Sequence, residues 1–247
     1  MKREDIGMNT EFRAQRPEGN RNKNNNSVGG NGLKTGIEKL DELIDISSGI
    51  ITLRSNNSRW LFSLAAAVLV RNHEPARKTL FLHWVDYHKR YWTMDYDFIS
   101  GAAKSMGHDA ESVSKSIFFI RAFSADSTEA DENWKRIFRF GRELNFAVLD
   151  SVSELFESRP KYAKKTKNQT YAIGMFSRLC LRNNCVGLVL DRSTKPVHPF
   201  LGGISSVIIS LCVERGVTAT VSKHPYLEDK TVQVVAWGQQ SLGRWLS

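Results

Sequence analysis

The sequence has little cysteine and no long apolar run, and each shortage excludes a class of protein. Its three cysteines, Cys180, Cys185 and Cys212, have no paired spacing, so they predict neither a disulfide framework nor a zinc ribbon. We expect three buried structural thiols in a reducing compartment. No segment approaches roughly eighteen uninterrupted apolar residues, and the opening MKREDIGMNTEF holds no signal-like stretch. We therefore expect a soluble, intracellular protein with no membrane partner.

Acidic residues are also in short supply relative to basic ones. The 247 residues include 35 Lys and Arg but only 26 Asp and Glu, which gives a formal net charge of +9. Such an excess favours anionic partners, of which nucleic acid is the commonest, although it says nothing about the fold. A chain of this length that is 41% hydrophobic can bury one sizeable core.

The first 34 residues are poor in apolar side chains and include the run RNKNNNSVGGNG. A stretch of this kind cannot bury enough surface to offset its ordering entropy, so we expect 1–34 to be a disordered basic tail. The tail is either a solvated leader or a basic arm that contacts nucleic acid or a partner. The remainder, 35–247, is predicted to form one core domain.

Strand-like runs alternate with helical patterns from Thr35 onward. Strands are predicted at 49–53, 79–85, 117–123, 146–150, 186–191, 205–214, 217–223 and 231–237, and helices at 36–44, 61–70, 98–106, 132–144 and 171–182. Near-continuous apolar strands separated by helices indicate an α/β protein whose mostly parallel sheet is covered on both faces. The closing strands have no long helices between them, which favours antiparallel additions at one edge.

Five segments, in this order, carry a resemblance to a known family. They are TGIEKLDELI, KSIFFIRAFSAD with its Arg121-Ala122-Phe123 triplet, NFAVLDSVSELF, HPFLGGISSVIISL and SKHPYLEDKTVQVVAWGQQSLG. Together they resemble the RadA branch of the RecA recombinase superfamily over roughly residues 35–243. The resemblance implies a RecA-like three-layer core and a RadA paralogue of the RadB-like kind.

The same resemblance exposes a missing motif. A phosphate-binding loop needs glycines for close backbone approach, a lysine and a Ser/Thr hydroxyl, but residues 54–60 read RSNNSRW. The family's water-activating acid falls near Val85. We therefore expect a vestigial nucleotide site, degenerate in Walker A, formed by Arg54, Arg59 and Asp150, with Asp150 capping the following turn. No ATP hydrolysis, little or no ATP binding and no cofactor are predicted.

Two segments match the positions at which the family binds DNA. The first, ESRPKYAKKTKNQTY, places five cations and two tyrosines in a predicted loop with no acid between them, as single-strand binding requires. The second lies between Leu190 and Gly202 and is shorter than in active recombinases. The candidate DNA-binding residues are Arg159, Lys161, Tyr162, Lys164, Lys165, Lys167, Arg192 and Lys195. A solvated basic loop remains the alternative for the first segment.

His83, Asp86, His88 and Asp95 match no standard metal spacing, so no metal site is predicted. The resulting hypothesis is a non-hydrolysing, DNA-binding accessory of homologous recombination and DNA repair. Its partners would be single-stranded DNA and a RadA-type recombinase or another paralogue, in a homo- or hetero-oligomer. The expected location is the cytoplasm, with the nucleoid, or the nucleus of a eukaryote. The alternative is a KaiC-like or RadB-like regulatory scaffold that binds proteins and has no direct DNA role.

Overall fold

The computed structural model describes residues 32–84, 96–122, 127–139, 143–150, 163–193 and 195–235. Within these ranges an eight-stranded mixed sheet runs in the order β3-β2-β4-β5-β1-β6-β7-β8. The strands are β1 (Gly49–Ser55), β2 (Lys78–Trp84), β3 (Ile117–Ala122), β4 (Leu144–Asp150), β5 (Val186–Asp191), β6 (Val207–Val213), β7 (Val217–Lys223) and β8 (Lys230–Val235). No helix in the described part of the chain is both long and apolar enough to cross a membrane.

The pairing directions divide the sheet into two parts. Strands β1 to β6 pair in parallel, whereas β7 and β8 add in antiparallel fashion beyond β6. The central strand β5 is buried at every position, but β7 alternates between buried and exposed residues. Parallel strands covered on both faces need continuous apolar runs, while an antiparallel edge can leave one face in water.

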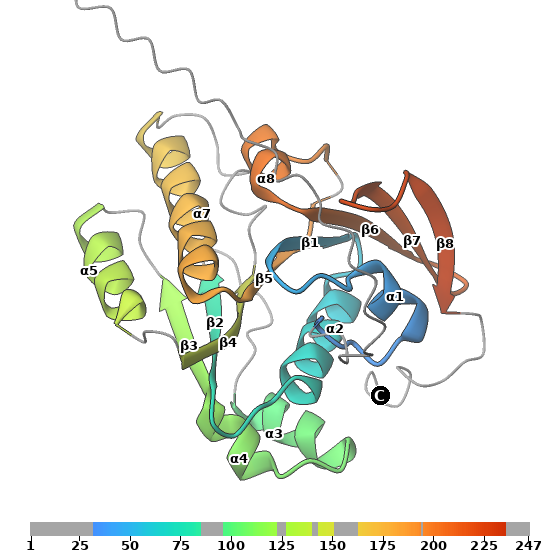
Figure 1. Cartoon of the computed structure of the whole chain (residues 1–247), viewed down its shortest axis with the longest axis horizontal. Helices are drawn as coiled ribbons and strands as arrows, with labels where there is room; N and C mark the ends of the chain where they lie inside the picture. The colour runs from blue at the N-terminus through green and yellow to red at the C-terminus, as the bar shows by residue number, and fades with distance from the viewer. Residues whose placement is uncertain are drawn as a thin grey trace, which may run out of the picture.

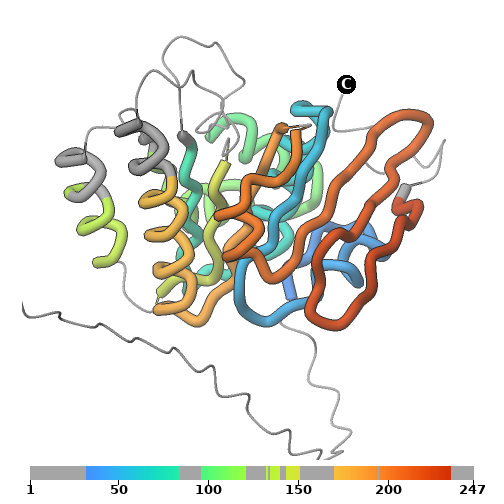
Figure 2. The backbone as a smooth tube through the Cα atoms, turned by 90° about the horizontal axis from the view of Figure 1, so that it is seen from above, coloured from blue at the N-terminus to red at the C-terminus, as the bar shows by residue number. Residues whose placement is uncertain are grey.

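Helices cover both faces of the parallel part (Figure 1). One hydrophobic core joins the sheet to α1 (Glu38–Leu43), α2 (Ser58–Arg71), α3 (Tyr96–Ser105) and α4 (Ala110–Ser116). A second core joins the opposite face to α5 (Ser127–Phe138), α7 (Ala163–Asn183) and α8 (Pro199–Ile204). Figure 2 shows α5 and α7 at the opposite end of the sheet from the β7–β8 hairpin. The α/β class, the three layers and the antiparallel C-terminal strands predicted from the sequence are confirmed.

Two local predictions are wrong, and the short helix α8 was not predicted. Residues 163–171, which were expected to lie in a loop, form the first turns of α7. Their run AKKTKNQTY contains no Gly or Pro, and the buried face of α7 at Ala172, Ile173 and Phe176 extends the helix backwards. The helix expected at 132–144 begins earlier, at Ser127, and ends at Phe138. The short α8 has Pro199 in its first turn and His198 as its cap.

The chain enters the core before the boundary expected at Thr35. Leu33 is buried, and Asn72 binds both sides of the Lys34 backbone. Its Oδ1 accepts from the Lys34 N–H at 2.8 Å, and its Nδ2 donates to the Lys34 carbonyl at 2.7 Å. The rest of the predicted tail, 1–31, lies outside the described residues.

Candidate functional site

Charged side chains occupy the carboxyl ends of four neighbouring parallel strands. Strand β1 ends near Arg54, β2 near His83, β4 at Asp150 and β5 at Asp191. The register pairs Arg54 with Asp191 and His83 with Asp150. Ligands of open α/β sheets bind at this edge, so these residues form the first candidate site.

Asp150 is the centre of a buried cluster. Its carboxylate accepts from Nη2 of Arg192 at 3.0 Å and 2.8 Å, one distance for each oxygen. Its Oδ2 also lies 2.8 Å from Nδ1 of His83. Because a carboxylate only accepts, Nδ1 of His83 is the donor in this contact. The side chains are 7% (Arg192), 5% (His83) and 1% (Asp150) exposed, so the charge on Asp150 is neutralised by the protein itself.

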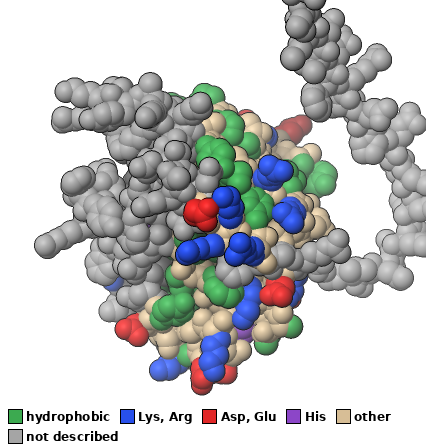
Figure 3. Space-filling model, turned by 90° about the vertical axis from the view of Figure 1, so that its left-hand side faces the viewer, with side chains coloured by type: hydrophobic (Ala, Val, Ile, Leu, Met, Phe, Trp, Pro, Cys, Tyr) green, Lys and Arg blue, Asp and Glu red, His purple; other side chains and the backbone are tan. Residues whose placement is uncertain are grey.

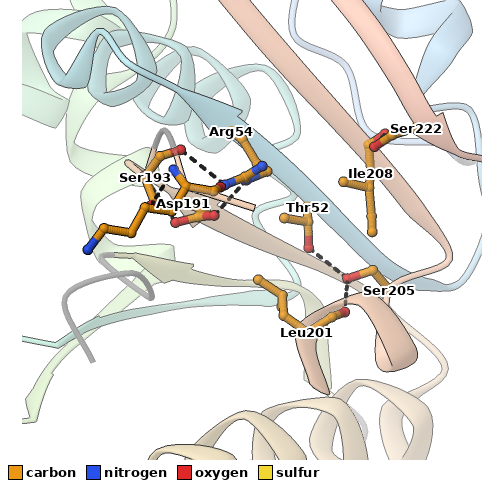
Figure 4. A network of polar contacts seen from close by, with 9 residues as sticks. Thr52, Arg54, Asp191, Ser193, Leu201, Ser205, Ile208 and Ser222 are labelled. Atoms are coloured by element: carbon orange, nitrogen blue, oxygen red, sulfur yellow. Dashed lines mark hydrogen bonds and ion pairs between the residues drawn. The ribbon is translucent and has the colours of Figure 1, made fainter. Parts of the chain in front are cut away.

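A second buried ion pair lies beside the first. Nε of Arg54 is 2.7 Å from Oδ2 of Asp191. Nη2 of Arg54 also donates to the carbonyls of Ser193, at 3.1 Å, and Lys195. Figure 4 shows this guanidinium between the carboxylate and the segment that follows β5. Arg54 therefore fixes that segment against the sheet edge.

Two hydroxyl groups bond to each other near Arg54. The Ser205 hydroxyl donates to the Leu201 carbonyl at 2.7 Å, so the Thr52 hydroxyl donates to Oγ of Ser205, 2.8 Å away. These contacts join β1 to the end of α8 (Figure 4).

The connection from β1 to α2 is very short. Only Asn56 and Asn57 separate the two elements, and Oδ1 of Asn57 accepts from the backbone N–H of Trp60 at 2.9 Å. The helix N–H groups that bind phosphate in other α/β proteins are therefore capped in part by the chain's own side chain. Two residues also leave no room for a loop that wraps a phosphate.

The structure separates the candidate DNA-binding residues. Lys164, Lys165 and Lys167 lie in the first turns of α7. Arg192 faces Asp150 in the interior, because the buried carboxylate requires a counterion, whereas Lys195 is exposed. Arg159, Lys161 and Tyr162 lie outside the described residues, as does the turn that Asp150 was expected to cap. Arg59 of the vestigial nucleotide set is exposed at the start of α2.

A groove between α5 and α7 was not foreseen from the sequence. It has a cavity volume of about 700 Å³ and is lined by four cations and four apolar or aromatic side chains: Trp134, Lys135, Phe138, Arg139, Tyr171, Met175, Arg178 and Arg182. Figure 3 shows Lys and Arg side chains gathered with hydrophobic ones on this face. The Arg182 guanidinium lies 5.8 Å from the centre of the Phe138 ring, and Lys135 forms an ion pair with Glu132 at 2.8 Å. The sequence does contain a feature that could have indicated this groove. Lys135 and Arg139 lie four residues apart, as do Arg178 and Arg182, and this spacing places each pair on one face of its helix.

Among the described residues no group of three or more His, Cys, Asp or Glu side chains is placed to hold a metal ion. Asp86, His88 and Asp95 lie outside these residues, and His83 contacts Asp150. The fold and the site define an α/β protein with buried ion pairs at the carboxyl edge of its sheet. No family model matches the chain, and no curated protein matches it.

Proposed function

We propose that this protein is a non-hydrolysing, RadA-like paralogue that binds single-stranded DNA as an accessory or mediator of homologous recombination and repair. The observation that carries the proposal is the Asp150 cluster at the carboxyl edge of a parallel sheet with antiparallel C-terminal strands. The order of the RadA-like sequence segments supports the same assignment. The site of action would be the nucleoid, or the nucleus of a eukaryote.

The proposed absence of hydrolysis is supported by what surrounds Asp150. In the family that the sequence resembles, this position belongs to the magnesium shell of the nucleotide. Here the carboxylate is bonded to Arg192 and His83, so a metal ion would have to displace a buried counterion. Removing one partner of a buried pair costs about 3–5 kcal/mol. Titration calorimetry with Mg-ATP is expected to show no binding, and micromolar binding that Asp150→Ala abolishes would contradict this.

Single-strand binding is supported by the arrangement of cations along α7. This helix has 21 residues and is therefore about 31 Å long. Positions 164, 167, 171, 178 and 182 recur at helical spacing and share one face. The first two are the lysines Lys164 and Lys167, and the last two are the groove arginines Arg178 and Arg182. Tyr171 between them is 42% exposed, and exposed aromatic rings are the groups on which bases stack.

The test is fluorescence anisotropy of a labelled poly-dT oligonucleotide at several salt concentrations. Arg178→Glu/Arg182→Glu is expected to weaken binding at least about tenfold. It should also reduce the magnitude of the slope of log binding constant against log salt concentration by about 1.4, near 0.7 for each lost phosphate contact. The matched control is Arg215→Glu/Lys230→Glu, which changes the net charge equally at exposed positions at the other end of the sheet. Equal losses in the two variants, or no binding by the unmodified protein, would reject the DNA role. Charge reversal at Lys164 and Lys165 tests the start of α7 in the same assay.

The apolar floor of the groove favours a second candidate, a KaiC-like or RadB-like scaffold that binds proteins. Trp134 is buried there, and its ring centre lies 6.3 Å from that of Phe138. Apolar side chains flanked by arginines are typical of protein interfaces. This candidate predicts that Arg178→Glu/Arg182→Glu weakens binding to a purified RadA-type recombinase and leaves binding to poly-dT unchanged.

A further inference from the structure

The amino ends of the parallel strands border a polar pocket of about 560 Å³. Its lining includes three permanently charged cations, Lys34, Arg71 and Arg77, but a single acid, Glu74. Arg77 is already engaged, since it donates to Asn145 Oδ1 at 3.3 Å and pairs with Glu74 at 3.8 Å. The remaining cations favour a small anionic ligand. Cys185 is also part of the pocket wall.

The end of α7 brings Cys185 together with Cys180. The backbone N–H of Cys185 donates to the Cys180 carbonyl at 3.0 Å, and that of Asn184 donates to the Leu181 carbonyl at 3.2 Å. Asn184 has a left-handed φ of 49°. These three features define a Schellman motif. In this motif, the two residues whose backbone bond spans five positions of the chain also make side-chain contact. The two cysteines occupy these positions and are only 1% and 3% exposed.

Space for this contact is provided by the neighbouring strand. A Cβ atom at Gly187 of β5 would lie 2.7 Å from Sγ of Cys180 and 2.9 Å from the Phe176 ring. Only glycine at this position therefore lets Cys180 lie where it does. The dithiol is built into the junction between α7 and β5.

The two thiols have different electrostatic environments. A hydrogen bond with Cys180 lowers the pKa of the Cys185 thiol, and the nearby Arg77 guanidinium lowers it further against the effect of burial. The same hydrogen bond, followed by burial, raises the pKa of Cys180 well above its ordinary value. Cys185 is thus the better nucleophile and Cys180 the protonated partner, as in pairs that exchange disulfides.

We propose that Cys185 and Cys180 form a thiol–disulfide exchange site for an anionic low-molecular-weight disulfide of the glutathione type, bound in this pocket. The Cys185 thiolate attacks one sulfur of the ligand disulfide, so that a mixed disulfide forms and one ligand thiolate leaves. Cys180 then gives up its proton to the released thiolate and attacks Sγ of Cys185, and the second ligand thiolate departs. Two protein thiols are oxidised and one external disulfide is reduced. The site is independent of DNA binding.

The third cysteine supplies an internal control. Cys212 is exposed, so the expectation of three buried thiols is wrong for this residue. Partial desolvation by its neighbours, then the carboxylate of Glu214, raises the pKa of its thiol. The structure places no second thiol beside it among the described residues. Cys212 can therefore accept a mixed disulfide but cannot resolve it within the chain.

The experiment treats the reduced full-length protein with oxidised glutathione and follows intact mass and peptide maps. The Cys212→Ser variant is expected to lose the mass of two hydrogens, with a disulfide joining Cys180 to Cys185. The additional change Cys180→Ser is expected to trap one glutathionyl group on Cys185. If Cys185 stays unmodified in that variant while Cys212 reacts in the unmodified protein, the exchange site is refuted.

A second comparison tests the pocket. Lys34→Gln/Arg71→Gln is expected to slow the reaction of Cys185 with oxidised glutathione severalfold, but to leave unchanged its reaction with neutral hydroxyethyl disulfide. Equal rates with oxidised glutathione before and after the substitutions would show that the cations do not recruit the ligand. Far-ultraviolet circular dichroism of each variant checks that α7 and β5 remain folded.

Discussion

The two ends of the parallel strands are built in opposite ways. At the carboxyl end, buried side chains form two bonded groups, Arg54 with Asp191 and Asp150 with His83 and Arg192. At the amino end, a pocket of about 560 Å³ keeps an excess of cations around its wall. At the carboxyl end, which binds ligands in most α/β folds, the described charges are paired within the protein, so we call it the closed end. The opposite end has the open pocket.

This difference has an energetic consequence. Burying an ion pair costs desolvation that only a complete set of partners repays, so each member of the Asp150 cluster depends on the others. Side chains around an open pocket remain partly hydrated and depend less on their neighbours. The carboxyl end should therefore be sensitive to single substitutions, and the amino end should tolerate them.

The largest expected effect is at Asp150. Asp150→Ala leaves the Arg192 guanidinium buried without its counterion, and we expect a loss of about 3–5 kcal/mol in the free energy of unfolding. Urea denaturation followed by tryptophan fluorescence measures it. The control Asp229→Ala removes the same charge from an exposed position and should change stability by less than about 0.5 kcal/mol.

A double variant separates charge compensation from simple loss of packing. Asp150→Ala/Arg192→Met removes both charges, so it is expected to be more stable than Asp150→Ala alone. It also keeps the test valid if the single variant does not fold. If the losses in free energy of unfolding from Asp150→Ala and Arg192→Met simply add in the double variant, the two residues are not coupled. The carboxyl end would then lack the interdependence that distinguishes it from the amino end.

The contrast between the two ends explains which features the sequence could predict. Apolar strand runs identify the sheet, and FAVLD places Asp150 at a strand end. Each of these two predictions depends only on residues that are adjacent in the sequence. The partners of Asp150 and Arg54 lie 42 and 137 residues away in the chain, so composition and spacing cannot reveal them. The same is true of the groove, since α5 and α7 each look like an ordinary amphipathic helix until they pack together.

A smaller effect is expected at Asn57, where α2 begins at the closed end. Asn57→Ala removes the acceptor for the Trp60 N–H and should reduce stability by about 1 kcal/mol, whereas Asn57→Asp keeps an acceptor and should not. Thermal denaturation of the three proteins makes the comparison. A change of several kcal/mol for Asn57→Ala would show that this residue belongs to the coupled ion-pair region, and no change would show that the cap contributes nothing.

The smallest effect concerns His73, which belongs to the wall of the open pocket. The Ser116 hydroxyl donates to the Val113 carbonyl and thus accepts from Nδ1 of His73 at 2.8 Å, which leaves Nε2 to accept from Ser112 at 2.9 Å. These bonds fit the neutral ring.

Burial, then the charge of His108, lowers the pKa of His73 from its ordinary 6.5. A histidine whose pKa is lower in the folded state binds its proton more readily when unfolded, so stability falls as the pH drops below 6.5. Urea midpoints at about pH 5 and about pH 8, on either side of that value, should therefore differ more for the unmodified protein than for His73→Gln. Because the other histidines are common to both proteins, parallel pH dependences would show that His73 is as hydrated as a free side chain. A steeper dependence in His73→Gln would mean that the folded state favours the protonated ring, and that the open end is more acidic than its lining suggests.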